Sequence, residues 1–266
     1  MDFESLMQSI QPVDGPVDGG WGLRLTEDWL QGRSAYGGLQ VSIVLKAMRA
    51  LIPDGAPLRT VQVTFLAPVP ANEDLRASAN ILRAGKNATH IEGRLKLGEQ
   101  LLCLVVGVFG ATRESAVRIR PVQPPVPAGK TITLPQIKGM TPDFLQHFDV
   151  RWLHGGLPYS GASEAKAIIE VGFKHSGTVN ELHLPAIADV IPPLAITLLK
   201  KPAPGSSMTW MLELLADRYD HLPLQGWRFD AEVLSAADGY TSQTAMIWAP
   251  DGSPAMLSRQ SMVVFG

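Results

Sequence analysis

Cysteine is almost absent from this chain. Cys103 is the single thiol among 266 residues, and it stands inside the apolar run Leu101–Ala111. One cysteine cannot form an internal disulfide, so the fold must rest on a packed core, and 45% apolar residues are enough to build one. We interpret Cys103 as a buried strand thiol in a protein of a reducing compartment.

Long apolar runs and an excess of charge are also missing. The run Leu101–Ala111 is the longest, and it is too short to span a bilayer. The amino terminus, Met1-Asp2-Phe3-Glu4, is acidic where a secretory signal would be basic. A net charge of −2 gives no broad attraction for nucleic acid or anionic membranes. We therefore expect a soluble, cytoplasmic protein with no nucleic acid partner and no membrane insertion.

The common catalytic motifs are not found either. The six histidines show no metal-ligand spacing, so we expect no metal and no cofactor, and we interpret His183 as a loop residue. There is no Gly-x-Ser-x-Gly elbow of a serine hydrolase. The glycine-rich stretch Gly32–Gly38 lacks the Lys-Ser/Thr ending of a phosphate loop, which argues against nucleotide hydrolysis.

What the chain does contain is an internal repeat. The matching segments of the first copy are Tyr36-Gly37-Gly38, Leu58–Ala67 and Leu101–Gly110, and those of the second are Ile187-Ala188-Asp189, Ser207–Ala216 and Arg259–Gly266. A repeat of this length has the size of a small domain. We predict two tandem copies, residues 1–112 and 141–266, joined by a proline-rich linker at 113–140. Asp189 takes the place of Gly38 in the second copy.

The first copy reads as one helix followed by antiparallel strands, and the second copy has two further strands, Phe148–Trp152 and Ala167–Phe173, before its helix. Residues 39–52 are apolar on nearly every side, which predicts a buried helix that stops at Pro53 and Asp54-Gly55. Four strand-like runs separated by turn residues follow it. Residues 185–199 supply the second helix, with Pro192 and Pro193 near its first turn, and further strands follow. This layout is an α+β fold in which the sheet wraps round the helix.

The order and spacing of these segments resemble a known family. With Tyr36-Gly37-Gly38, Ala188-Asp189, the Ser207–Trp210 strand and Gln260, the chain is similar to acyl-CoA thioesterases of the double-hotdog type, related to bacterial acyl-CoA thioesterase II. The resemblance covers roughly residues 20–110 and 145–266. It implies a tandem hotdog fold and hydrolysis of acyl-CoA to a free carboxylic acid and CoA.

The resemblance also implies site residues. In that family an Asp at the start of the second helix, a Thr or Ser on the following strand and a Gln on the final strand hold the water that attacks the thioester. Carried over, these are Asp189, Ser207 or Thr209, and Gln260, with Ser206 left open as a third hydroxyl. Three residues at the start of the first helix are assigned to substrate binding, namely Tyr36, Gly37 and Gly38.

These residue types suit the chemistry. A carboxylate at a helix N-terminus can orient or deprotonate water, and the N–H groups there can polarise a carbonyl. A hydroxyl and a carboxamide can fix the water, because each both donates and accepts. Simpler interpretations stay open: Asp189 as a helix N-cap, Gln260 as a buried structural hydrogen bond, and Ser207 and Thr209 as ordinary strand polarity.

Other functions on the same fold compete with this one. A dehydratase or hydratase would need an Asp and a His at a helix start, and neither copy supplies the His. A catalytically silent acyl-CoA or lipid-binding protein would keep the fold and lose the water site. The pattern leaves both that alternative and a homo-oligomer open.

Overall fold

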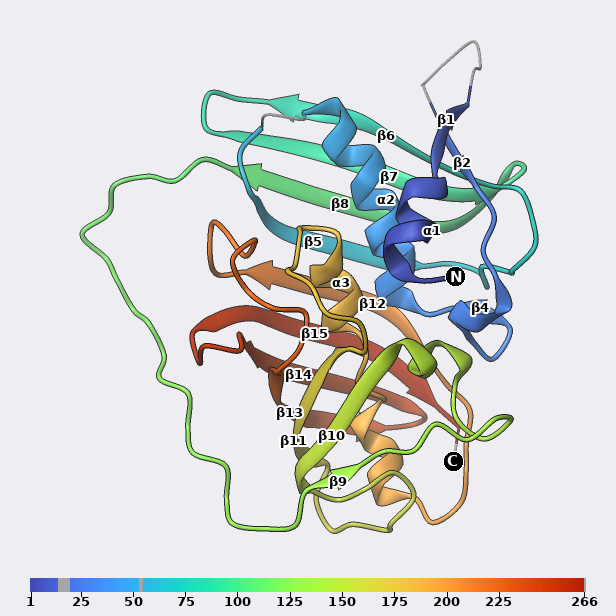
Figure 1. Cartoon of the computed structure of the whole chain (residues 1–266), viewed down its shortest axis with the longest axis vertical. Coiled ribbons are helices and arrows are strands. Elements are labelled where there is room, and N and C mark those ends of the chain that lie inside the picture. Colours follow the sequence, from blue (N-terminus) through green and yellow to red (C-terminus); the bar gives the residue numbers. More distant parts are fainter. Residues whose placement is uncertain (14–19, 53–54, 266) are drawn as a thin grey trace.

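The computed structural model describes residues 1–13, 20–52 and 55–265 (Figure 1). The first half contains α1 (Phe3–Ser9), β1 (Gln11–Val13), β2 (Gly20–Leu23), η1 (Glu27–Trp29), β3 (Leu30–Gln31), β4 (Ser34–Ala35), α2 (Gly37–Leu51), β5 (Leu58–Phe65), β6 (Leu75–Ala84), β7 (Ala88–Leu97) and β8 (Gln100–Gly110). The second half contains β9 (Ile132–Thr133), η2 (Asp143–His147), β10 (Phe148–Gly155), β11 (Lys166–Phe173), α3 (His183–Ala188), η3 (Leu194–Leu198), β12 (Gly205–Leu214), β13 (Trp227–Ala237), β14 (Tyr240–Trp248) and β15 (Pro254–Val264).

The two halves share one antiparallel sheet. In the described residues it has 13 strands in the order β1-β2-β6-β7-β8-β5-β12-β15-β14-β13-β11-β10-β9. The halves meet where β5 pairs with β12, with Val63 opposite Trp210. Because each of these strands finds a partner in the other half, neither is left as an open edge. The predicted α+β layout with antiparallel strands is confirmed.

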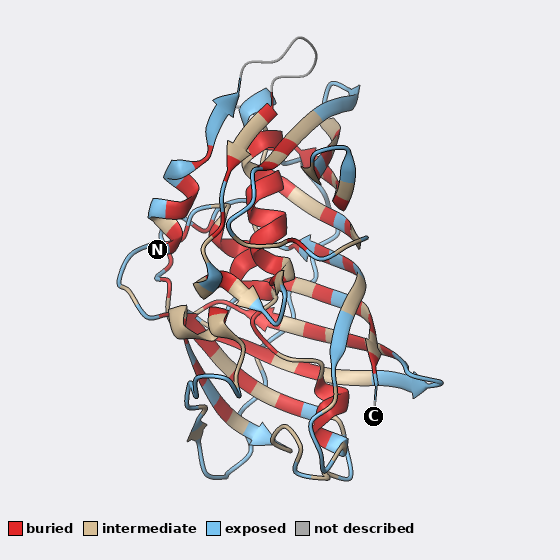
Figure 2. Cartoon of the chain, turned by 90° about the vertical axis from the view of Figure 1, so that its right-hand side faces the viewer, coloured by how far each residue is buried: buried red, intermediate tan, exposed pale blue. Residues whose placement is uncertain are grey.

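Helix α2 lies in the concave side of the sheet and is buried along most of its length (Figure 2). It packs on β6, β7 and β8, and a glycine in each of the last two strands, Gly93 and Gly107, makes room for it. A Cβ at Gly93 would clash with Val44 Cγ1, so only glycine lets the helix approach this closely. The buried helix predicted for residues 39–52 is therefore confirmed, while its stop signals at Pro53 and Asp54 lie outside the described residues.

The second predicted helix, 185–199, is wrong in extent. The chain instead forms α3, of six residues, and then the 3₁₀ helix η3, with Pro192 and Pro193 between them. A proline disfavours helical backbone at the preceding residue, and its own nitrogen has no hydrogen to donate, so the two prolines divide the segment. Asp189 is consequently the C-cap of α3 and does not start a helix. His183, expected in a loop, is the first residue of α3 and only 2% exposed.

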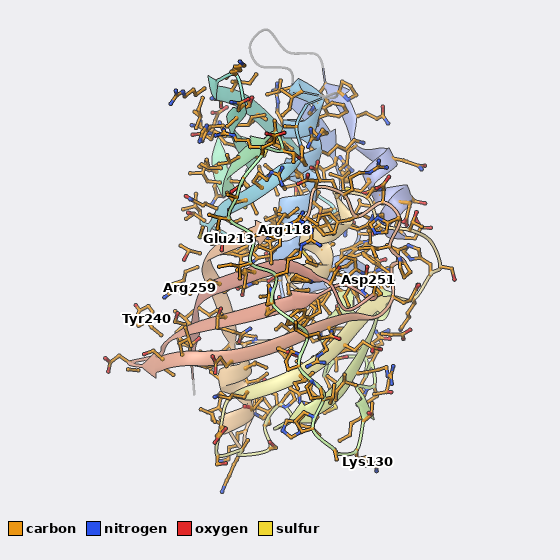
Figure 3. The ribbon with its side chains drawn as sticks, turned by 90° about the vertical axis from the view of Figure 1, so that its left-hand side faces the viewer. Arg118, Lys130, Glu213, Tyr240, Asp251 and Arg259 are labelled. Carbon is orange, nitrogen blue, oxygen red and sulfur yellow. The ribbon has the colours of Figure 1, made fainter. Side chains whose placement is uncertain are left out.

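The two faces of the sheet differ in polarity. Inward side chains form the core, which includes Cys103, and burial raises the pKa of that thiol. Outward side chains include most of the polar and charged residues of the strands, and Figure 3 shows Arg259 and Tyr240 pointing away from the strands. Residues 111–131 contain no helix or strand and run outside the sheet. The short strand β9 lies within the predicted linker and pairs with β10, which follows the linker. No helix in the described ranges is long and apolar enough to cross a membrane.

Candidate functional site

Three side chains from separate parts of the second half form a hydrogen-bonded chain. Gln260 Nε2 donates to Asp189 Oδ1 at 2.5 Å, and Ser207 Oγ donates to Gln260 Oε1 at 3.2 Å. Asp189 follows α3, Ser207 lies on β12 and Gln260 lies on the adjacent strand β15. The structure therefore brings together the acid, one hydroxyl and the carboxamide that the sequence singled out.

Strand pairing places Gln260 on the inner face. It is 5% exposed, and it pairs across the sheet with Trp210, whose ring is also buried. The Trp210 Nε1–H group donates to Ser258 Oγ at 2.9 Å, two residues before Gln260. A buried carboxamide needs hydrogen-bond partners, and the side chains of Asp189 and Ser207 supply them.

A β-bulge decides which hydroxyl reaches the site. Ser207 pairs with Met262 and Thr209 with Ser261, so Met208 is skipped in the ladder. The extra residue shifts the alternation of side chains, which puts Ser207 on the same inner face as Trp210. Thr209 is exposed on the outer face, and the structure does not bring it to Gln260. Ser206 is also exposed, and its Oγ donates to the Ser207 carbonyl at 3.4 Å.

The start of α2 belongs to the same site. Gly38 N donates to Asp189 Oδ2 at 2.7 Å, although the two residues come from opposite halves. A Cβ at Gly37 would lie 2.8 Å from Asp189 Oδ2, and one at Gly38 would lie 2.5 Å from the carbonyl oxygen of Pro185. Only glycine permits this approach. The sequence predicted Gly38 and Asp189 at two separate helix starts, whereas the structure places the start of α2 against the end of α3.

Tyr36 lies behind this contact. It is the N-cap residue of α2, its hydroxyl donates to the Ala186 carbonyl at 3.3 Å, and its ring stacks on Phe144 at a centroid distance of 4.2 Å. Burial, and secondarily the nearby charge of Asp189, raise the pKa of Tyr36 well above its ordinary value. Its phenol therefore stays neutral and acts as a hydrogen-bond donor beside the acid.

Asp189 titrates close to neutrality. Burial raises the pKa of its carboxyl to about 6, against the opposing effect of the hydrogen bonds from Gln260 and Gly38. The free N–H groups in the first turn of α2 also favour negative charge at this place. A carboxyl with a pKa near 6 is mostly ionised at pH 7 and can still hold a proton transiently, as a general base requires.

A second cluster of titratable side chains lies outside this site. Glu4 Oε1 is 2.9 Å from His183 Nε2 and 3.0 Å from His175 Nε2. The three residues have the types and spacing of metal ligands, and sequence reasoning missed them because Glu4 lies 171 positions from His175 and 179 from His183. The backbone N–H of Asn180 donates to His183 Nδ1 at 3.0 Å, which leaves the proton of the neutral ring on Nε2. That nitrogen then donates to Glu4 and is not free for a metal ion.

Two family models match the chain and together cover most of it. The model described as the acyl-CoA thioesterase N-terminal domain matches residues 25–110, and that of the acyl-CoA thioesterase C-terminal domain matches residues 121–264. No curated protein matches the chain.

Solved structures match over nearly the whole length. They include a protein with a hot dog fold from Alicyclobacillus acidocaldarius, with a TM-score of 0.85, 18% identity and 98% of each chain covered. The tesB protein of Mycobacterium avium subspecies paratuberculosis matches with a TM-score of 0.76 and 11% identity, and the match covers 100% of each chain. The acyl-CoA thioesterase II TesB2 of Mycobacterium marinum matches with a TM-score of 0.71 and 14% identity, and the match covers 98% of this chain and 97% of the other. At these identities the likeness shows the fold, and the predicted tandem hotdog is confirmed.

Proposed function

The chain belongs to the acyl-CoA thioesterase family and is a thioester hydrolase, and from that premise we propose that Asp189, Ser207 and Gln260 hold and activate the water that cleaves acyl-CoA. Asp189 is the general base. Gln260 and Ser207 orient the water, since an amide and a hydroxyl can each donate to it or accept from it. The products are a free carboxylic acid and CoA.

The reaction balances with a single acid–base group. The water oxygen attacks the thioester carbonyl carbon while Asp189 takes one of its protons, which gives a tetrahedral oxyanion. When this collapses, the carbon–sulfur bond breaks and the protonated Asp189 returns its proton to the departing thiolate of CoA. No group outside the chain, the substrate and water is needed.

The start of α2 supplies stabilisation for the oxyanion. The first-turn N–H groups of a helix have no intrahelical acceptors, and the one on Gly38 already reaches Asp189. A carbonyl placed beside Asp189 therefore lies near the positive end of the α2 dipole, with further N–H groups on Gly37 and Leu39. This supports substrate binding by the Tyr36-Gly37-Gly38 segment.

One observation carries the proposal: a buried carboxyl with a pKa near 6 is hydrogen-bonded to Gln260, which is in turn bonded to Ser207. A plain helix cap needs neither the raised pKa nor the partners on two strands. The cap that Asp189 does provide acts on α2, in the other half of the protein.

The test is Asp189→Asn in a free-thiol release assay with acyl-CoA substrates of several chain lengths. We expect kcat to fall by roughly two to four orders of magnitude. The matched control is Asp149→Asn, an exposed aspartate on β10, which leaves hydrolysis unchanged. If a folded Asp189→Asn protein hydrolyses thioesters at the normal rate, Asp189 only caps α2 and another group activates the water.

A further inference from the structure

A cleft of about 410 Å³ lies near the carboxyl terminus. Its lining consists of Leu199, Lys200, Lys201, Pro202, Ala203 and Phe265. The segment from 199 to 203 connects η3 to β12, and Phe265 follows the end of β15. The lining therefore combines an apolar surface, two lysines and one aromatic ring.

The cleft adjoins the end of the two strands that carry the candidate site. Phe265 N donates to the Pro204 carbonyl at 2.9 Å, and Gly205 pairs with Val264, so the ladder between β12 and β15 begins at the cleft wall. Ser207 is only four residues beyond Ala203, which limits their separation to roughly 14 Å. The extended arm of a long ligand can cover a span of that length.

The apolar side of the cleft is anchored to the same site. Leu199 packs with Ala195, Ile196 and Val264 in a small cluster. The N–H of Leu194, which starts η3, donates to Gln243 Oε1 at 2.6 Å. Gln243 pairs across the sheet with Gln260. Helix η3 is thus fixed to the strand next to the carboxamide that holds Asp189.

The charge at the cleft is positive and unused. Lys200 and Lys201 are exposed, and in the described part of the chain neither ammonium group forms an ion pair. The Phe265 ring is 61% exposed although it lines the cleft. Free ammonium groups bind phosphates, and an exposed aromatic ring offers a face for stacking.

We propose that this cleft binds the nucleotide end of CoA. Lys200 and Lys201 bind its phosphates, Phe265 stacks on the adenine, and the pantetheine arm follows the apolar wall toward Ser207. The proposal rests on the proposed function only for the position of the thioester, which the arm delivers beside Asp189. Among the described residues that line the cleft none is acidic, so a polyanion meets no repulsion from their side chains.

The test compares two substrates with the same acyl group. One is the acyl-CoA, and the other is the N-acetylcysteamine thioester, which has no phosphate and no adenine. In the double variant Lys200→Ala/Lys201→Ala we expect the ratio of kcat/KM for acyl-CoA to kcat/KM for the short thioester to fall at least roughly tenfold. The matched control is Lys130→Ala/Lys138→Ala, two exposed lysines in the linker segment of the sequence, and there the ratio is unchanged (Figure 3 labels Lys130 at the far end of the second half).

A binding measurement separates this proposal from the catalytic one. Adenosine 3′,5′-bisphosphate is titrated into the wild-type protein and both double variants in a calorimeter, which needs no hydrolysis. Weaker binding in the Lys200/Lys201 variant alone supports the cleft even if Asp189 proves not to be catalytic. Equal affinity in all three proteins, or an equal selectivity ratio in both variants, overturns it.

Discussion

Asp189 combines burial with ionisation, and its pH dependence follows from that. Because its pKa is about 6 and only the carboxylate can accept a proton from water, kcat should rise with pH and reach half its plateau near pH 6. The measurement is a pH–rate profile at saturating acyl-CoA between pH 5 and 8.5. In Gln260→Ala, which removes a hydrogen bond that favours the charged form, the midpoint should move upward. A flat wild-type profile would assign the proton transfer to another group.

The same carboxylate should destabilise the folded protein above pH 6. The folded pKa lies above the ordinary value of 3.8, so the stabilising effect of the protonated form is complete below that value and is lost as pH rises through about 6. The difference between the folded pKa and the ordinary value corresponds to about 3 kcal/mol of unfolding free energy. In Asp189→Asn the carbonyl oxygen of the new side chain still accepts from the Gly38 N–H. The Gln260 carboxamide can rotate by half a turn, so that its oxygen accepts from the NH₂ group of Asn at position 189.

The expected result is that Asp189→Asn gains stability relative to wild type as pH increases. Urea unfolding at pH 5 and pH 8 measures the free energy of unfolding of both proteins. The difference between them should increase by about 1.4 kcal/mol, the part of the full effect that falls between these two pH values, and all other titrating groups cancel in that difference. An equal difference in unfolding free energy between the two proteins at both pH values would contradict a raised pKa of Asp189.

Removal of the Ser207 hydroxyl and removal of the Thr209 hydroxyl should have different effects on kcat. Ser207→Ala removes the group that donates to Gln260 and should lower kcat roughly tenfold. Thr209→Ala alters an exposed residue on the outer face and should leave kcat unchanged. Steady-state kinetics with one acyl-CoA compares the two variants. The reverse order would place Thr209 at the site and remove the role of the bulge.

Sequence reasoning could not choose between these hydroxyls. Strict alternation groups Ser207 with Thr209, and it also sets both of them apart from Trp210. The bulge at Met208 breaks that alternation, and no residue type at this position indicates a bulge. Asp189 and Gln260 were assigned through the resemblance to the thioesterase family, and the comparison of the two copies and the apolar companions of Gln260 on its strand face agreed with that assignment.

At the scale of elements, α3 is held in place by α1. Glu4 accepts a hydrogen bond from His183, the first residue of α3, and Asp189 is the C-cap residue at the other end of that helix. Phe3 also contacts the His183 ring at a centroid distance of 4.6 Å. The amino-terminal helix thus restrains the short helix that positions the candidate base. Sequence reasoning found neither α1 nor this contact, because seven residues give too little periodicity to predict a helix.

Removing the Glu4 carboxylate should therefore weaken the fold. Glu4→Ala leaves the buried Nε2–H of His183 without an acceptor, which should lower the free energy of unfolding by about 1–3 kcal/mol at pH 7. Glu99→Ala, an exposed turn residue, is the control and should have little effect. Urea unfolding monitored by tryptophan fluorescence compares them. An unchanged midpoint for Glu4→Ala would show that α1 does not restrain α3.

The pH dependence of this contact follows from His183 and Glu4 together. Burial lowers the pKa of His183 and Glu4 partly restores it, so removing Glu4 lowers that pKa further. The stability of Glu4→Ala should therefore fall more steeply than that of wild type as pH drops through the ordinary histidine value of 6.5. The stability gap between the two proteins should widen from pH 7 toward pH 5, and it should narrow only below the ordinary Glu4 value of 4.5, where the wild-type carboxylate is protonated.

At the scale of the whole molecule, the internal repeat predicts the fold and an edge-to-edge junction of the two sheets, but not the side-chain contacts between the copies. Similar sequences imply similar halves, and pairing of β5 with β12 follows from the need to cover two open edges. The contact between the copies leaves no periodic pattern in the sequence. Arg49 of α2 pairs with Glu181 at 2.6 Å across the halves, and nothing in the surrounding residues indicates it.

The difference between Gly38 and Asp189 has a steric explanation at this scale. These corresponding positions of the two copies lie against each other: a Cβ at Gly38 would be 2.9 Å from Asp189 Cβ. Two side chains cannot occupy that space, so one copy must have glycine for the other to have the acid. A single acid therefore serves both halves, and its partner N–H comes from the copy that has glycine.

Gly38→Ala tests this arrangement. The added methyl would lie 2.5 Å from the Pro185 carbonyl oxygen, which is backbone and cannot move away alone, so α2 and α3 must separate. We expect a loss of about 1–3 kcal/mol in unfolding free energy and a larger fall in kcat than in KM, because the Gly38–Asp189 hydrogen bond lengthens. Gly129→Ala, where the nearest atom is 4.0 Å away, is the control. If Gly38→Ala retains normal kcat and stability, the halves tolerate separation and the site does not depend on their close contact.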